Sequence, residues 1–186
     1  RPGLASQEIS KFNDFLEQDN NVEGLTYDNK NNRLLLVCKS YVEGFEEVRS
    51  VFAFDLASET LRKEPVYSVD RKEMRDFLDS CPETRKHKKL VAFINERKNY
   101  ELAPSAIAIH PKTGQVFITS SVGKILVVLG SNGKIQHVRK LDKDFFAQPE
   151  GLVFTPDGTL YISTEAKGDE PARIYRLPYQ PGFVGM

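Results

Sequence analysis

Residues 148–165, QPEGLVFTPDGTLYISTE, decide how the whole chain can be interpreted. An apolar run at residues 152–154 is followed by Asp157-Gly158 and then by a second β-rich run at residues 160–163. An Asp-Gly pair between two such runs is a strong indicator of a β-hairpin, because glycine readily adopts the positive φ that hairpin turns require. This segment therefore predicts two antiparallel strands joined by a tight turn.

Two earlier segments repeat the same pattern. Residues 21–39 read NVEGLTYDNKNNRLLLVCK, and residues 103–121 read APSAIAIHPKTGQVFITSS. When the three segments are aligned, a small residue (Gly24, Ala106 or Gly151) starts the first strand of each unit. Three copies of one hairpin unit indicate a repeat architecture.

Each repeat extends beyond its hairpin to the size of one β-propeller blade, which has four antiparallel strands. In the first repeat we expect strands near residues 24–27, 33–38, 50–55 and 65–69. In the second we expect them near residues 106–109, 115–120, 124–129 and 135–140. The third repeat, about residues 146–179, ends in a short strand near residues 173–177. The predicted fold class is therefore all-β, with three propeller blades.

Two helical segments accompany these blades. Apolar residues at helical spacing predict an N-terminal helix within residues 1–20 and a helical insertion at about residues 70–99. In the insertion, Asp70 with Glu73 resembles a capping box at the start of the helix. The chain is thus divided into a helical segment, the blades with their insertion, and an irregular tail, at residues 1–20, 21–179 and 180–186.

Composition narrows the classes of function. The 186 residues carry no formal net charge, so nothing global favours a nucleic acid or an acidic membrane as a partner. No apolar run approaches the roughly 20 residues that span a bilayer, and no signal peptide is visible. The two cysteines, Cys38 in an apolar strand and Cys81 at a helix end, are expected to be buried or half-buried thiols.

The repeats bring distant polar residues together. The first strand of a blade lies nearest the propeller axis, so Glu23, Ser105 and Glu150 should share one face near that axis. The second strands end on the same face, which adds Lys39 and Glu165. We expect these five residues to form a ligand-binding site in one shallow funnel.

Three interpretations of this funnel remain open. Glu23, Glu150 and Glu165 could hold a divalent cation such as Ca²⁺, which prefers oxygen ligands. Two of them could instead act as an acid/base pair. They could also have a purely structural role, capping backbone N–H groups or pairing with Lys39. No catalytic residue is assigned, and the three histidines share no metal-ligand spacing.

The repeats resemble the SdiA-regulated (YjiK-like) family of bacterial β-propeller proteins, in its C-terminal half. The resemblance covers about residues 20–179. It is carried by residues 22–28, 34–39, 103–111, 148–152 and 161–165. It implies a propeller of about six blades, located in the periplasm or at the cell surface. A membrane would be reached only through a lipid anchor or an N-terminal segment missing here.

Two features depart from that pattern. Three repeats cannot close a ring, so either an N-terminal half is missing or two chains complete each other as a homodimer. In the middle repeat, Ser105 stands where the other repeats have Glu23 and Glu150, so any acidic ring is incomplete in this chain.

Two functions follow from the resemblance and the funnel. The first is a cell-envelope module that binds a small ligand, a cation or a protein and breaks no bond. The alternative is a calcium-dependent hydrolase resembling phytase-like or lactonase-like propellers, with cation-bound water as the nucleophile and Glu23, Glu150 or Glu165 as ligands. The fold alone does not decide between them.

Overall fold

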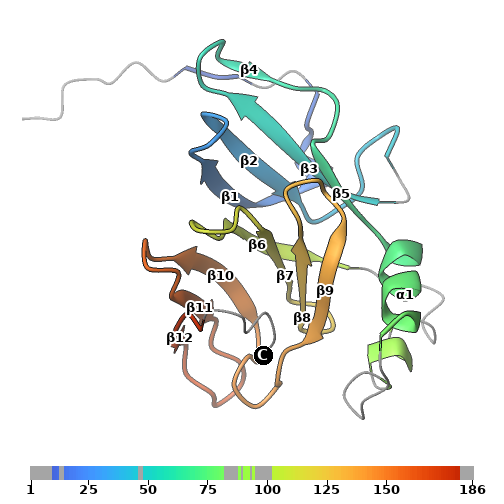
Figure 1. Ribbon diagram of the computed structural model, residues 1–186, viewed down its shortest axis with the longest axis vertical. Coiled ribbons are helices and arrows are strands. Elements are labelled where there is room, and N and C mark those ends of the chain that lie inside the picture. The colour runs from blue at the N-terminus through green and yellow to red at the C-terminus, as the bar shows by residue number, and fades with distance from the viewer. Residues whose placement is uncertain are drawn as a thin grey trace, which may run out of the picture.

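The computed structural model describes residues 10–12, 15–45, 48–81, 88, 90–92, 94 and 102–180. This part of the chain is mostly β and forms three antiparallel sheets that stand next to one another (Figure 1). The first strands of the sheets, β1 (Val22–Asp28), β6 (Pro104–Ile109) and β10 (Pro149–Phe154), are neighbours. The sheets are therefore arranged as successive propeller blades, as predicted.

The first blade is a five-stranded sheet. Its strands follow in the order β1, β2 (Arg33–Cys38), β3 (Val48–Asp55) and β4 (Thr60–Leu61). β5 (Tyr67–Asp70) also pairs with β3, at the end that β4 leaves free. The predicted fourth strand is thus present as β5, and the two-residue β4 is an addition that the sequence did not indicate.

The second and third blades differ in their number of strands. The second has four, β6, β7 (Val116–Ser120), β8 (Ile125–Leu129) and β9 (Ile135–Lys140). Among the described residues the third has three, β10, β11 (Leu160–Thr164) and β12 (Arg173–Leu177). Each predicted strand of these two repeats is found, and the third blade has one strand fewer than a standard blade.

The hairpin turn at Asp157-Gly158 has the predicted geometry. Gly158 has a φ of +92°. The Asp157 carboxylate accepts hydrogen bonds from the backbone N–H of Thr159 at 3.0 Å and from the Thr155 hydroxyl. These bonds favour the charged carboxylate and lower the pKa of Asp157 to about 2. The turn is therefore fixed by side-chain bonds that link β10 to β11.

The hydrophobic core lies between the blades. Leu35 and Val37 of the first blade belong to one buried cluster with Ile107 and Ile118 of the second. A second cluster, centred on Leu126 and Val128, packs against the third blade through Leu152. All five residues of β8 are buried, because the second blade has a neighbour on each face.

The N-terminal segment differs from the prediction. Residues 1–9, 13 and 14 of the expected helix lie outside the described residues, and its residues 10–12 and 15–17 are not helical. Among the described residues of this segment, helical geometry is confined to a 3-10 turn, Gln18–Asn20. The reason is tertiary packing, because the rings of Phe12 and Phe15 lie 5.1 and 5.2 Å from those of Phe54 and Phe52 in the first blade.

The first part of the predicted helical insertion is present, and of its remainder residues 82–87, 89, 93 and 95–99 lie outside the described residues. Helix α1 (Arg71–Asp79) starts at Asp70, whose carboxylate accepts a hydrogen bond from the backbone N–H of Glu73 at 2.8 Å. Its buried residues Met74 and Leu78 join the core cluster of the first two blades. No helix in the described ranges is long and apolar enough to cross a membrane.

Both cysteines are free thiols, as expected. Cys38 is fully buried in β2, and burial raises the pKa of its thiol to about 11. Cys81, just after α1, is half-buried. Cys38 is therefore a core residue that stays protonated at neutral pH.

Candidate functional site

A β-bulge at the start of each first strand marks the candidate site. The register shifts between Val22 and Gly24, between Pro104 and Ala106, and between Pro149 and Gly151. The extra residue in each case is one of the three predicted axial residues, Glu23, Ser105 and Glu150. A bulge leaves its extra residue unpaired in the ladder and redirects the side chain, which often happens next to functional sites.

Glu23 and Lys39 form an ion pair across the first two strands of the first blade. The Lys39 Nζ lies 3.0 Å from the Glu23 Oε1, and about a third of each side chain is exposed, 34% for Lys39 and 30% for Glu23. The structural pairing that the sequence left open is therefore present. At this exposure such a pair contributes at most about 1 kcal/mol, so another ligand can compete for either partner.

Glu150 is electrostatically coupled to the other charged residues of the site. Its carboxyl group is half-buried, and burial is the largest cause that raises its pKa above the usual 4.5. The negative charges of Glu165 and Glu23 raise the pKa further, while Lys39 opposes them. Charged side chains of the first and third blades therefore act on one another, as the propeller geometry predicts.

Gln148 links the carboxylates of the third blade, although no role was predicted for it. Its Nε2 donates a hydrogen bond to the Glu165 Oε2 at 3.0 Å, and a side-chain hydrogen bond with Glu150 lowers the pKa of Glu150. The only signal in the sequence is its position next to Pro149, at the start of the strand that carries Glu150. We refer to Glu23, Lys39, Gln148, Glu150 and Glu165 as the axial cluster.

Ser105 occupies the predicted position but its hydroxyl is already engaged. The side chain is buried, and its Oγ donates to the carbonyl oxygen of Pro149 at 2.6 Å. The Thr119 hydroxyl lies 3.4 Å away. Ser105 therefore ties the second blade to the third at Pro149, next to Glu150, and its role as a ligand-binding residue stays a prediction.

The calcium site on Glu23, Glu150 and Glu165 also stays a prediction. Within the part of the chain that the structure describes, no three His, Cys, Asp or Glu side chains are grouped closely enough to hold a metal ion. The carboxylates of the axial cluster would have to move together to coordinate one. Lys39 would then have to leave Glu23.

His110 has a structural environment on the second blade. The ring is buried among Phe117, Phe154 and Tyr179, and its Nδ1 accepts hydrogen bonds from the backbone N–H groups of Lys112 and Thr113 at 3.3 and 3.2 Å. Burial, aided by the positive charge of Lys112, lowers its pKa. His110 is therefore a neutral residue of the seam between the second and third blades.

This environment predicts a pH-dependent stability. The folded state holds His110 neutral, whereas the unfolded chain protonates it near pH 6.5. The neutral His110 ring makes its full contribution to the free energy of unfolding above pH 6.5. This contribution is lost as the pH falls from 6.5 through the lowered pKa that His110 has in the folded state. We expect His110→Asn, which keeps an acceptor but cannot titrate there, to flatten the decline in the free energy of unfolding between pH 7 and 5. Urea titrations at each pH measure the free energy of unfolding. A decline that is equally steep in His110→Asn and in the wild type would contradict the prediction.

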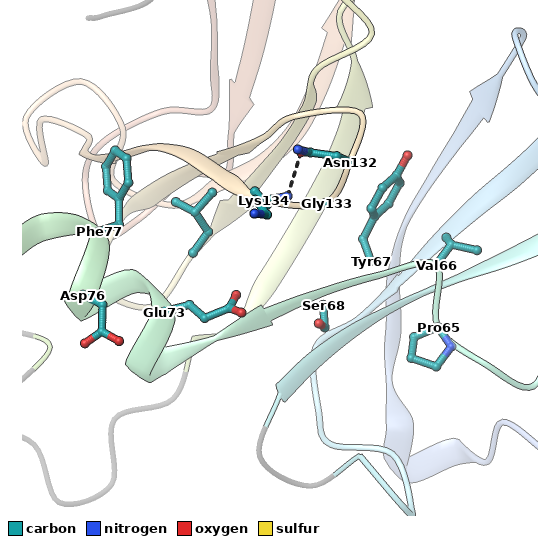
Figure 2. A pocket seen from close by; sticks show the side chains of 11 residues that line it. Pro65, Val66, Tyr67, Ser68, Glu73, Asp76, Phe77, Asn132, Gly133 and Lys134 are labelled. Atoms are coloured by element: carbon teal, nitrogen blue, oxygen red, sulfur yellow. Dashed lines mark hydrogen bonds between the residues drawn. The ribbon is translucent and has the colours of Figure 1, made fainter. Parts of the chain in front are cut away.

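Two hollows lie away from the axial cluster. A groove of about 470 Å³ separates α1 from residues 65–68 and from the β8–β9 turn, with Glu73 and Asp76 on one side and Lys134 on the other (Figure 2). A larger apolar hollow of about 650 Å³ lies on the outer face of the first blade. None of the predicted site residues lines either hollow.

The second hollow belongs to a sheet face that has no neighbouring blade in the described structure. It is lined by aliphatic side chains of the first blade, including Leu25, which is 62% exposed. The third blade also exposes apolar residues, Val153 at 57% and Ile174 at 73%. Both outer blades thus present apolar residues of the kind that the inner blade–blade contacts bury.

Three successive antiparallel sheets of three to five strands, with their first strands side by side, define a β-propeller module. The chain belongs to the SdiA-regulated family, whose model matches residues 4–178. The family resemblance noted in the repeats is thereby confirmed. No curated protein matches the chain.

Solved structures confirm the propeller fold. A chain of the nidogen/laminin complex matches with 16% identity and a TM-score of 0.51, over 87% of this chain and 46% of that chain. Further matches are the hydrazine synthase of Kuenenia stuttgartiensis, with 12% identity, a TM-score of 0.43 and 86% and 32% coverage, and the Malassezia sympodialis allergen Mala s 1, with 17% identity, a TM-score of 0.44 and 84% and 44% coverage. The chain spans less than half the length of each.

Proposed function

We propose that the chain is part of a binding propeller whose axial cluster takes a positively charged group. The observation that carries this proposal is the raised pKa of Glu150, which results from burial and from two neighbouring carboxylates. The cluster contains three carboxylates and one ammonium group, so it has an excess of negative charge when fully ionised. A bound cation would relieve this repulsion, and a neutral or anionic ligand would not.

The class of ligand follows from the groups present. Carboxylate and amide oxygens, which Glu23, Glu150, Glu165 and Gln148 supply, suit a hard divalent cation such as Ca²⁺. They also accept hydrogen bonds from a protonated amine. The hydrolase alternative draws on the same raised pKa, because general-acid catalysis by a carboxyl group requires a pKa above its usual value. We propose the cell envelope as the location of the chain, as the family resemblance implies.

Calorimetric titration with CaCl2 and, separately, with a diamine tests this function. We expect saturable binding of at least one of them to the wild-type chain, and at least tenfold weaker binding to Glu150→Gln, because one charge-assisted contact is worth about 1.5–3 kcal/mol. Asp76→Asn, which breaks an exposed ion pair with Lys72 on α1, is the matched control and should bind normally. Absence of binding to the wild type would refute the proposal, and turnover of a phosphoester or lactone would favour the hydrolase.

Glu150→Gln, which should weaken cation binding, should at the same time make the folded protein more stable. Glu150→Gln removes a carboxylate whose ionised form is disfavoured in the folded protein, so it should raise the free energy of unfolding at pH 7 by about 0.5 kcal/mol. The sign follows from linkage, because a raised carboxyl pKa means that folding is less favourable above it. Thermal unfolding at pH 7 and pH 4 measures the effect, which should shrink at the lower pH. Loss of stability at pH 7 would contradict this account of the cluster.

We also propose that further blades cover the outer faces of the first and third blades. The exposure of Leu25, Val153 and Ile174 supports this proposal, since inner seams of the protein bury such residues. The cover is either a second copy of this chain or the rest of a longer propeller. Sedimentation of the isolated chain distinguishes these two covers, because a homodimer would favour a second copy of this chain. A stable, monodisperse monomer that shows no tendency to associate would count against covered faces.

A further inference from the structure

Arg49 is a buried cation at the start of β3. It is 4% exposed, although arginine is almost never fully buried unless it is paired. β3 starts at the end of the first blade where β2 finishes. Arg49 therefore lies at the same end of the blade as Lys39, but it points into the seam with the second blade and reaches the segment before β6.

Its contacts do not neutralise its charge. The Nε of Arg49 donates a hydrogen bond to the carbonyl oxygen of Leu102, and the guanidinium lies 3.6 Å from the centre of the Tyr41 ring. The Nη1 is buried and has no hydrogen-bond partner. No acidic side chain of the described ranges is among the contacts of this guanidinium.

Arg33 of the same blade shows the usual arrangement. Its Nε lies 2.8 Å from the Asp28 carboxylate, and both side chains are largely buried, 14% and 7% exposed. The guanidinium lowers the pKa of Asp28, although burial acts in the opposite direction as the largest single influence. Within the part of the chain that the structure describes, one buried guanidinium is thus paired with a carboxylate and the other is not.

A buried, unpaired charge is costly. Desolvation of a guanidinium is only partly offset by one carbonyl and one aromatic ring, and an unsatisfied buried N–H group in a native protein calls for an explanation such as a bound ion. The surrounding loop is held in place, because the Nδ2 of Asn20 donates to the carbonyl oxygen of Tyr41 at 3.0 Å. Tyr41 itself is 41% exposed, so the ring that lies against the guanidinium reaches solvent.

We infer that Arg49 is an oxyanion-binding residue, which takes a carboxylate or phosphate group of a ligand at the seam between the first and second blades. The planar guanidinium donates to such groups through two parallel N–H bonds, and a lysine would not reproduce this geometry. The site is separate from the axial cluster and does not depend on cation binding there.

Titration of the full chain with inorganic phosphate and, separately, with acetate tests this inference at constant ionic strength set with NaCl. We expect the thermal midpoint to rise with one of these anions and to saturate. Arg49→Met, which keeps the length of the side chain without its charge, should weaken the binding by about 30-fold or more, the loss typical of a desolvated charge pair. A response to phosphate alone identifies a phosphate ligand, and a response to acetate alone identifies a carboxylate.

Two further variants keep the test decisive. Arg62→Met removes an exposed guanidinium that lies 3.7 Å from Asp55, and it should leave the anion response unchanged. Arg49→Lys retains the charge and should bind the anion more weakly than the wild type, so it serves if Arg49→Met does not fold. An equal loss in Arg62→Met, or a wild-type chain whose midpoint responds to neither anion in a saturable way, would overturn the inference.

Discussion

Phe52→Ala is expected to cost about 3–5 kcal/mol of the free energy of unfolding, the range for removing a fully buried phenylalanine side chain. Phe52 is the largest of the fully buried side chains in the described structure. Its ring lies 5.2 Å from that of Phe15 and 6.2 Å from that of Phe45. The substitution would therefore leave a cavity where the N-terminal segment and the loop before β3 meet the first blade. The thermal midpoint should fall by roughly 10 °C or more.

Phe54→Ala is the matched control for this prediction. Phe54 lies two residues further along β3 on the same face, but it is only half-buried, and its ring lies 5.1 Å from that of Phe12. Its loss should cost about half as much, because less apolar surface is exposed by the change. Urea unfolding of both variants provides the comparison. If Phe54→Ala were the more damaging, the packing of residues 15 and 45 on Phe52 would be wrong.

Gly24→Ala is expected to destabilise the protein by about 1–3 kcal/mol, which is typical of overpacking. A Cβ at this position would lie 2.7 Å from the Val37 Cγ1 and 3.0 Å from the backbone nitrogen of Ile107. The second contact is with the backbone of the neighbouring blade, so it cannot be relieved by rotating a side chain. The change would push the first two blades apart next to the axial cluster.

Gly151→Ala is the matched control, because Gly151 has the same place in the third blade. Among the described residues the added Cβ would meet only the side chain of Ser163, with the Oγ at 2.3 Å, and this hydroxyl can rotate away. We expect a cost well below that of Gly24→Ala in the isolated chain. Equal costs, measured by urea unfolding, would show that another sheet also covers the third blade.

Much of the fold could be predicted because its signals are local. The Asp157-Gly158 turn and the period-2 runs beside it depend on a few neighbouring residues, and they place the strands to within a few positions. Alignment of the repeats then put Glu23, Ser105 and Glu150 at equivalent positions. The bulges that redirect these three residues have no such signature, because they depend on how each first strand pairs with the second.

The remaining features depend on contacts that are distant in sequence. Phe12 and Phe15 pack on the first blade, and this packing outweighs the helical spacing of the segment. The Ser105 hydroxyl is engaged by a carbonyl oxygen 44 positions away. Arg49 looks like an ordinary strand residue until its burial and its unpaired Nη1 are seen in the structure.

The most direct test of the axial cluster is the pKa of Glu150, measured by NMR of the carboxyl carbon with and without CaCl2 or the diamine. We predict that the pKa of Glu150 lies above 4.5 in the free wild-type protein. This pKa should be lower in Glu165→Gln, and it should fall markedly when a cation binds to the wild type. A pKa at or below 4.5 that responds neither to Glu165→Gln nor to either cation would contradict a coupled, cation-binding cluster.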